Sequence, residues 1–197
     1  WKKIILPMHG QHNVLNCLAS ICVAIEMGIS ERIIRTTLNN FKGIKRRFEN
    51  KGVSKNGVRV IDDYGHHPVE INSALSAARL LAPKTKIIAI FQPHRYSRLR
   101  DLFDDFCSSF NNADTVLLLD VYAAGEKPIK NYDSSDLEKG LTKYGHKNVL
   151  YIKDQNLLAK KLLNIIKPDD LIICLGAGSI TKIANNLEEK LKNEHRY

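Results

Sequence analysis

The feature that most constrains the fold of this chain is a series of short apolar segments separated by helical patterns. After about residue 40, apolar runs occur at 86–91, 115–120, 149–152 and 170–175. A strand that is apolar on both faces needs cover on both faces, which is typical of a parallel sheet between two layers of helices. The sequence therefore predicts an α/β protein, with a Rossmann-like, mostly parallel sheet and helices on both of its faces.

Helix termini mark the segments between these runs. Pro68 suits the first position of a helix that extends to about residue 81. Ser97 is expected to cap a helix that extends to about residue 110. Further helices are expected from a capping-box pair, Ser135 and Glu138, to about Gly145, and over 155–166 and 179–192.

Residues 1–40 do not follow this alternation. Their apolar residues recur at helical spacing and predict a helix over 13–27, which Gly28 would end. Ser30 is expected to cap a second short helix that ends near residue 40. We expect this short helical segment to be the tail of a preceding domain.

Residues 41–197 are expected to form the α/β domain. Two strands, at 47–50 and 58–62, would open it, joined by a turn over 51–57 in which Asn56-Gly57 is a hairpin signal. The predicted boundary between the two units therefore lies near Phe41 to Lys45, a short stretch that contains Gly43.

Composition and charge narrow the class of function. The 197 residues carry a formal net charge of +9, but the lysines are scattered through predicted helices, so no nucleic-acid surface is expected. No apolar run approaches the roughly 20 residues that span a bilayer, and the start of the chain lacks a signal-peptide pattern. Because the chain does not begin with Met, we expect a fragment or a processed piece of a longer protein.

The four cysteines are expected to be free thiols. Cys17, Cys22 and Cys174 lie among apolar residues and are expected to be buried, and no cysteine pair has C-x-x-C spacing. This pattern is typical of a reducing cytosol rather than of a disulfide framework.

Polar clusters follow four predicted strands. The carboxyl ends of parallel strands meet at one edge of a sheet, where α/β proteins bind ligands. The first cluster is the densest, because it places two carboxylates, a phenol and two imidazoles in seven residues. The clusters are Asp62-Asp63-Tyr64-Gly65-His66-His67-Pro68, then residues 92–98 and 120–126, and Gly176-Ala177-Gly178-Ser179.

These clusters suggest anion binding more than metal binding. Arg95 and Arg98 are three residues apart at a helix start, and arginine suits carboxylate or phosphate contacts. The turn that ends at Ser179 can present backbone N–H groups to an anion. A metal hydrolase centred on His66-His67 is an alternative, but adjacent loop residues give no defined ligand geometry.

Two further features stand apart from the sheet. Asn13 and Asn16 share one face of the first predicted helix. Capping explains Asn13 but not Asn16, which lies one turn further along where asparagine is a poor helix former. Arg46-Arg47 lies at the predicted domain junction, where arginine can point into an interdomain cleft.

Together these segments resemble the Mur ligases of peptidoglycan synthesis. The resemblance covers nearly the full chain and implies the end of a central ATP-binding domain, residues 1–40, followed by a C-terminal Rossmann-like ligase domain, residues 41–197. A G-x-x-x-x-G-K-[ST] phosphate loop is absent from the sequence, so the chain alone should be inactive. The resemblance rests on four segments: Gly10-x-His12-Asn13-x-x-Asn16, Lys45-Arg46-Arg47-Phe48, Asp62 to Pro68, and Pro93-His94-Arg95-Tyr96-Ser97-Arg98.

The resemblance also implies a reaction. These bacterial cytoplasmic enzymes use ATP and Mg²⁺ to make an amide bond through an acyl phosphate, and the His-Arg-Tyr-Ser-Arg stretch is most similar to members that join L-alanine to UDP-N-acetylmuramate. Mg²⁺ is expected to be bound mainly by the missing upstream part. Alternatives are a murein peptide ligase of the same family, which has a similar double-histidine loop, and a free-standing nucleotide- or nucleic-acid-binding module.

The site residues follow from the same resemblance. His12, Asn13 and Asn16 would lie against adenine, and Arg47, with Arg46, would reach the γ-phosphate. Asp62 or Asp63 would contact the ribose or the hinge. The residues expected to face the acyl and amino-acid end are Tyr64, His66, His94, Arg95 and Arg98, with Ser179 in the turn that donates N–H groups; the sequence leaves open which histidine acts as a base.

Overall fold

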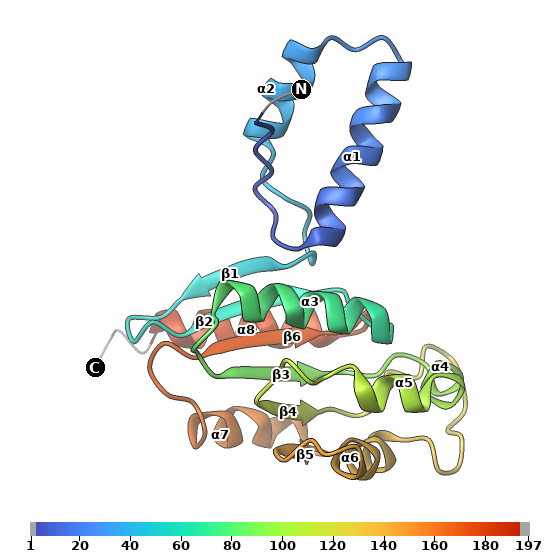
Figure 1. The fold of residues 1–197 in the computed structure, drawn as a ribbon. Helices are drawn as coiled ribbons and strands as arrows, with labels where there is room; N and C mark the ends of the chain where they lie inside the picture. Colours follow the sequence, from blue (N-terminus) through green and yellow to red (C-terminus); the bar gives the residue numbers. More distant parts are fainter. Residues whose placement is uncertain (1–2, 194–197) are drawn as a thin grey trace.

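The computed structural model of this protein describes residues 3–193, and within that range the sheet has six strands. Strand β1 is antiparallel to β2, and the remaining neighbours are parallel, so the predicted mostly parallel sheet is confirmed (Figure 1). In sheet order the strands are β1 (Glu49–Val53), β2 (Arg59–Asp63), β6 (Leu171–Leu175), β3 (Ile87–Phe91), β4 (Thr115–Leu118) and β5 (Val149–Tyr151).

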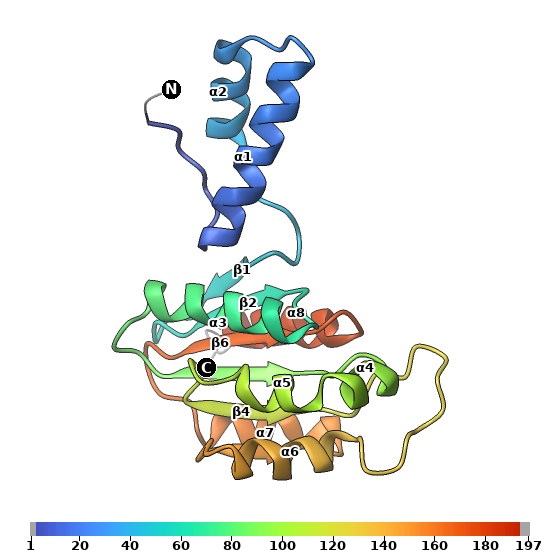
Figure 2. The same ribbon diagram turned by 45° about the vertical axis from the view of Figure 1, so that its right-hand side comes forward.

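Helices cover both faces of the sheet, as predicted (Figure 2). Successive residues of β3 point to opposite faces: Ala89 belongs to the core on one face and Ile90 to the core on the other. The helices on the Ala89 face are α3 (Pro68–Leu81), α4 (Tyr96–Asp101), α5 (Phe103–Ser108) and α6 (Ser134–Lys143), and those on the Ile90 face are α7 (Leu158–Leu163), preceded by the 3₁₀ turn η1 (Gln155–Leu157), and α8 (Ile180–Asn193).

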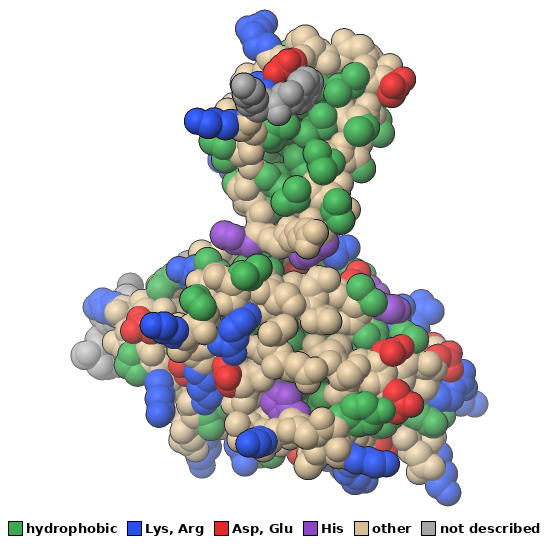
Figure 3. Space-filling view, viewed as in Figure 1, with side chains coloured by type: hydrophobic (Ala, Val, Ile, Leu, Met, Phe, Trp, Pro, Cys, Tyr) green, Lys and Arg blue, Asp and Glu red, His purple; other side chains and the backbone are tan. Residues whose placement is uncertain are grey.

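A helical hairpin, α1 (Gln11–Glu26) and α2 (Glu31–Asn40), projects from the β1 side of the sheet (Figure 1). Its apolar side chains are largely uncovered: Val14 and Leu18 are each 49% exposed, and Ile21 is the buried member of the predicted stripe. Figure 3 shows hydrophobic side chains gathered over this hairpin. None of the helices in residues 3–193 combines the length and apolarity that a bilayer crossing demands.

Several predicted element ends are wrong for local reasons. Ser97 does not cap a helix over 97–110, because Arg95 is the N-cap of α4 and the Ser97 hydroxyl donates to Glu126. Leu102, at φ −122°, then separates α4 from α5. The capping box of α6 is formed by Asp133 and Asp136 rather than by Ser135 and Glu138, since each of these two carboxylates accepts the backbone N–H of the other residue.

The hairpin that opens the α/β domain is shifted relative to its prediction. Phe48 has φ +52°, and its N–H donates to Asp63, so regular pairing starts at Glu49 rather than at residue 47. The turn is correspondingly short, with the Gly57 N–H donating to the Ser54 carbonyl. In the first helix, Gly10 rather than Asn13 occupies the N-cap.

The cysteines are free, but not all are buried. Cys107 and Cys174 are buried, Cys17 is half-buried, and Cys22 is exposed on α1. The prediction for Cys22 is wrong because its apolar neighbours on the helical hairpin are themselves uncovered.

We predict that Leu75→Ala lowers the free energy of unfolding by about 2–5 kcal/mol, because the side chain is fully buried between α3 and the sheet. Leu80→Ala on the same helix is the matched control: Leu80 is 80% exposed, so its loss should change stability by less than about 0.5 kcal/mol. Urea unfolding of both variants measures the difference, and equal effects would contradict this packing.

Candidate functional site

The four polar clusters meet at one edge of the sheet. Strands β2, β6, β3 and β4 are neighbours, and their carboxyl ends carry the loops that the sequence singles out. Backbone hydrogen bonds join these loops: the Gly176 N–H donates to the Asp63 carbonyl (3.2 Å), and the Gln92 N–H donates to the Leu175 carbonyl (3.0 Å). His94 and Tyr122 form an isolated parallel bridge. The predicted grouping of the clusters is therefore the observed one.

Four rings from three of these loops form a continuous array. The ring centroids of Tyr64 and His66 are 5.1 Å apart, and those of His66 and His94 are 5.8 Å apart. The Tyr122 ring stacks on His94 at 5.4 Å with an interplanar angle of 10°. Tyr122 was not among the expected site residues, although it lies in the 120–126 cluster.

His66 and His67 divide their roles. The His67 ring accepts from the Val69 N–H and, with Glu70, forms the capping box of α3, so this histidine has a structural role. The His66 ring turns instead toward His94. Its Nδ1 lies 3.0 Å from the Tyr64 carbonyl oxygen and 3.3 Å from Glu70 Oε2.

His94 lies among positive charges. Arg98 Nη1 is 3.2 Å from His94 Nδ1 and donates to the His94 carbonyl at 3.1 Å. Burial, and then the charges of Arg98, His66 and Arg95, hold the pKa of His94 below its ordinary value. Arg95 itself adopts φ +72° as the N-cap of α4, and its N–H donates to the Tyr122 carbonyl.

Arg46 and Arg47, on the linker between α2 and β1 (residues 41–48), both lie over the Tyr64 ring but have different ion-pair partners. Arg46 turns toward the sheet: it donates to the Gly176 carbonyl (2.5 Å), lies 3.8 Å from Asp62 Oδ2, and covers the Tyr64 ring at 4.8 Å. Arg47 instead lies 3.6 Å from Glu70 Oε1. The Arg47 side chain is the more exposed of the two, at 42% against 22% for Arg46.

The two aspartates at the end of β2 also separate. Asp62 is fully buried and accepts from the Thr181 hydroxyl at 2.6 Å. Asp63 accepts from the N–H groups of Phe48 and Gly65, each at 2.7 Å, and borders a groove. Burial raises the pKa of both carboxyl groups, against the hydrogen bonds that lower it.

This groove lies between α1, the linker and the start of α3, and its volume is about 500 Å³. It brings the helix residues predicted from the sequence together with the linker arginine. Asn13 is buried and its amide donates to the His9 carbonyl at 2.7 Å, while Asn16 is exposed. The predicted site residues that line the groove are His12, Asn13, Asn16, Arg47 and Asp63, joined by Glu70, which the sequence did not single out.

The turn after β6 is partly occupied by a side chain of the protein. Gln92 Nε2 donates to the Ser179 hydroxyl at 3.2 Å, and its Oε1 accepts from the Ile180 N–H at 3.1 Å. Ser179 therefore lies at the predicted sheet edge, but Gln92 already uses part of the hydrogen-bonding capacity that was expected there.

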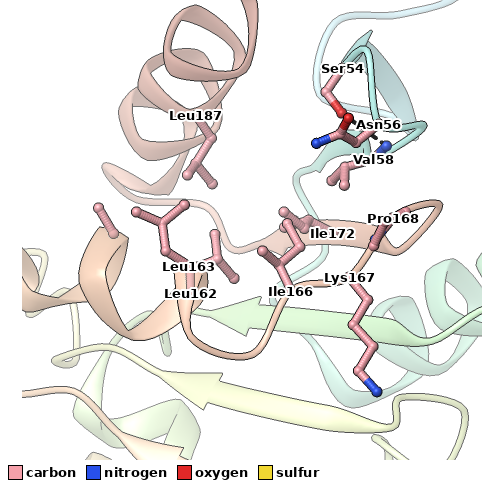
Figure 4. A pocket seen from close by; sticks show the side chains of 11 residues that line it. Ser54, Asn56, Val58, Leu162, Leu163, Ile166, Lys167, Pro168, Ile172 and Leu187 are labelled. Carbon is pink, nitrogen blue, oxygen red and sulfur yellow. Dashed lines mark hydrogen bonds between the residues drawn. The ribbon is translucent and has the colours of Figure 1, made fainter. Parts of the chain in front are cut away.

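A separate apolar cavity of about 170 Å³ lies at the opposite end of the strands, between α7, α8 and the β1–β2 turn (Figure 4). Leu162, Ile172 and Leu187 line it, and the Lys167 amine extends away from it. Its lining is mainly aliphatic, and the Ser54 hydroxyl there accepts from the Val58 N–H at 3.0 Å.

The chain is similar to proteins of one family. Residues 46–178 match the family described as "Mur ligase, glutamate ligase domain". The UDP-N-acetylmuramate--L-alanine ligase of Paramagnetospirillum magneticum is 52% identical over 186 residues, which are 94% of this chain and 39% of that protein. The crystal structure of UDP-N-acetylmuramate-alanine ligase from Thermotoga maritima has a TM-score of 0.80 at 27% identity and covers 96% of this chain and 40% of that one.

A murein peptide ligase from Psychrobacter arcticus shares the fold, with a TM-score of 0.67 at 24% identity over 96% of this chain and 39% of that one. This chain thus spans about two fifths of the length of the relatives that it matches.

We predict that Arg98→Met raises the pKa of His94 toward its ordinary value near 6.5, because a neighbouring positive charge is lost. Histidine NMR titration of this chain measures the change. Arg100→Met is the control, since Arg100 pairs with Asp101. An unchanged His94 titration in Arg98→Met would contradict the contact between the Arg98 guanidinium and the His94 ring.

The lowered pKa of His94 also makes the stability of the fold depend on pH. The unfolded chain binds the His94 proton more readily than the folded chain does, so stability begins to fall as the pH drops below about 6.5 and continues to fall through the lower pKa of the folded state. This pH dependence should be weaker in Arg98→Met.

Proposed function

The chain belongs to the Mur ligase family, and we propose that it forms the C-terminal part of an ATP-dependent ligase that joins L-alanine to the carboxylate of UDP-N-acetylmuramate. The family match confirms the resemblance found in the sequence motifs. The observation that carries the proposal is the 52% identity, across 94% of the chain, to a relative with that name. The activity is assigned to a longer protein, acting in the bacterial cytoplasm in peptidoglycan precursor synthesis, because the chain spans only part of such relatives.

The proposed chemistry requires an activated carboxylate. A free carboxylate is a poor electrophile, so the muramate carboxylate first takes the γ-phosphoryl group of ATP and becomes an acyl phosphate. The L-alanine amine then attacks the acyl carbon, and phosphate leaves. Negative charge gathers in both steps, and fixed arginine side chains stabilise it.

We assign the groove beside α1 to ATP. His12, Asn13 and Asn16 line its helical wall and would contact adenine, and Asp63 would contact the ribose. Arg47, on the linker, would reach the γ-phosphate. What supports this assignment is that residues from three distant parts of the sequence line one groove of about 500 Å³.

Two residues first considered for ATP have other contacts. Asp62 and Arg46 hold the linker and α8 against the sheet, which supports a role in shaping the groove. The family resemblance is the basis on which we assign Mg²⁺ mainly to the part of the ligase outside this chain. Among the described side chains, no group of three or more His, Cys, Asp or Glu is placed to hold a metal ion.

We assign the ring array and its arginines to the acyl and amino-acid end. Arg95 and Arg98 suit the L-alanine carboxylate, because guanidinium groups bind carboxylates in a planar, two-point manner. His66 contacts Glu70 of the ATP groove and His94 contacts Arg98, so the two imidazoles would face the reacting atoms. Tyr64 packs under Arg46 beside His66, and Ser179 completes the edge with Gln92.

We also propose that residues 1–40 are the tail of the central ATP-binding domain. The uncovered apolar side chains of α1 support this boundary, since a helix with an apolar stripe needs a partner. The partner is then the rest of the central domain, and the ATP groove lies at the junction.

We predict that Arg47→Ala, in the full-length ligase that contains this chain, lowers turnover by roughly 10²–10³-fold, because a donor to developing phosphate charge is lost. Phosphate release that depends on both UDP-N-acetylmuramate and L-alanine measures turnover. Arg59→Ala is the matched control, at the amino end of β2 on the opposite edge of the sheet.

Normal turnover in Arg47→Ala would contradict the proposed contact of Arg47 with the γ-phosphate. If the unmodified ligase accepts an L-alanyl peptide in place of L-alanine, the enzyme is a murein peptide ligase and the proposed substrate is wrong.

We predict that Leu18→Glu changes the stability of this 197-residue chain by no more than about 0.5 kcal/mol, because Leu18 is half exposed in it. In the full-length ligase the same change should lower stability by about 2 kcal/mol or more, since a charge would be buried against the central domain. Ser20→Glu, on the opposite side of α1, is the control. Thermal unfolding of both proteins decides the matter, and equal small effects would refute the boundary.

A further inference from the structure

The Nδ1 atoms of His66 and His94 face different groups: hydrogen-bond acceptors at His66 and a donor at His94. His66 Nδ1 faces two hydrogen-bond acceptors, the Tyr64 carbonyl oxygen at 3.0 Å and Glu70 Oε2 at 3.3 Å. Only a protonated Nδ1 satisfies these neighbours. In the neutral ring, the lone pair of His66 is therefore on Nε2.

His94 has the reverse arrangement. Its Nδ1 lies 3.2 Å from Arg98 Nη1, and a guanidinium group donates but does not accept. Nδ1 must therefore accept, and in the neutral ring Nε2 carries the proton. The two imidazoles, 5.8 Å apart, are thus set as opposite tautomers, with a proton acceptor on one and a donor on the other.

Glu70 is the carboxylate that fixes His66, and it is itself well held. One of its oxygens accepts from the backbone N–H groups of His66 (3.0 Å) and His67 (3.2 Å), and the other lies 3.6 Å from Arg47. Burial raises the pKa of Glu70, but these hydrogen bonds and charges outweigh it and lower the pKa overall, so the group is ionised. Glu70 therefore touches both the groove and the imidazole pair.

We propose that Glu70 is a positioning residue that holds the His66 proton on Nδ1, so that His66 Nε2 accepts the proton of the attacking L-alanine amine while His94 Nε2–H donates to the acyl oxygen. The inference rests on the proposed function. The C–N bond forms as the C–O bond to phosphate breaks, the electron pair leaves with phosphate, and the amine proton passes to His66. The resulting imidazolium is stabilised by Glu70 at Nδ1 and later releases its proton to water.

The charges around His66 explain why a carboxylate is needed. Tyr64 lies beside its ring under Arg46 and Arg47, and the β3 loop brings His94 with Arg98 and Arg95. The negative charge of Glu70, 3.3 Å from His66 Nδ1, faces these positive charges across the ring.

The variant that isolates the role of the negative charge is Glu70→Gln. A glutamine oxygen still accepts the backbone N–H groups of the α3 capping box, but the negative charge is gone. Glu70→Asp keeps the charge and also suits this position, since Asp136 fills the same place in the capping box of α6. Asp136→Asn is the matched control for loss of charge at a capping box away from the imidazoles.

In the full-length ligase, Glu70→Gln should lower kcat by roughly 10-fold or more and leave the KM for UDP-N-acetylmuramate nearly unchanged, because a group that orients a catalytic imidazole is lost. Glu70→Asp, which keeps the charge, should restore part of this loss. Turnover equal to that of Asp136→Asn would overturn the proposal.

A second measurement does not depend on activity. Long-range proton–nitrogen NMR of this chain reports which ring nitrogen carries the proton, and we expect Nδ1–H for His66 and Nε2–H for His94. The same tautomer on both rings would overturn the proposal even if the ligase is active. Conversely, opposite tautomers in a full-length protein that does not use L-alanine would refute the proposed function and leave the arrangement of the rings intact.

Discussion

The carboxylate of Asp63 is the contact on which the site depends. It ends β2 and accepts from the N–H groups of Phe48 and Gly65, so it joins the linker to the loop after β2. Burying a carboxylate is costly unless hydrogen bonds compensate, and here two backbone donors do so. Beside it, Asp62 binds Thr181 on α8 and lies near Arg46. Two neighbouring acids therefore fix the linker, a loop and a helix at one corner of the sheet.

The order of the strands in the sheet determines which loops lie next to each other. Strand β6 lies between β2 and β3, although it is last in the sequence, so the loops after β2 and β3 reach toward each other across the turn after β6. The ring array spans this gap, with His66 from one side and His94 from the other. Arginines from the linker and from α4 border the array, which gives the edge its positive charge without a dense cluster in the sequence.

The sequence predicts the sheet, its mostly parallel strands and the meeting of the polar loops, because apolar runs and strand ends are local signals. It does not predict the break at Leu102, since the apolar pattern continues across it, nor the Asp133–Asp136 cap, which uses a shorter acid than the usual pair. Adjacent Arg46 and Arg47 are indistinguishable in the sequence and are separated by backbone conformation. Glu70 reads as an ordinary helix-start acid, and its contact with Arg47 exists only in the folded chain.

The left-handed backbone of the linker has a mechanical consequence. Arg46 and Phe48 adopt φ of +58° and +52°. A left-handed backbone costs about 1–2 kcal/mol for each residue other than glycine. The two carboxylates at the end of β2 contact these residues and hold the linker in this strained conformation. Gly43, at φ +85°, carries no such penalty and lies just before them. Rotation of the helical hairpin is therefore expected to be easiest at Gly43, and Arg47 would then move together with the sheet.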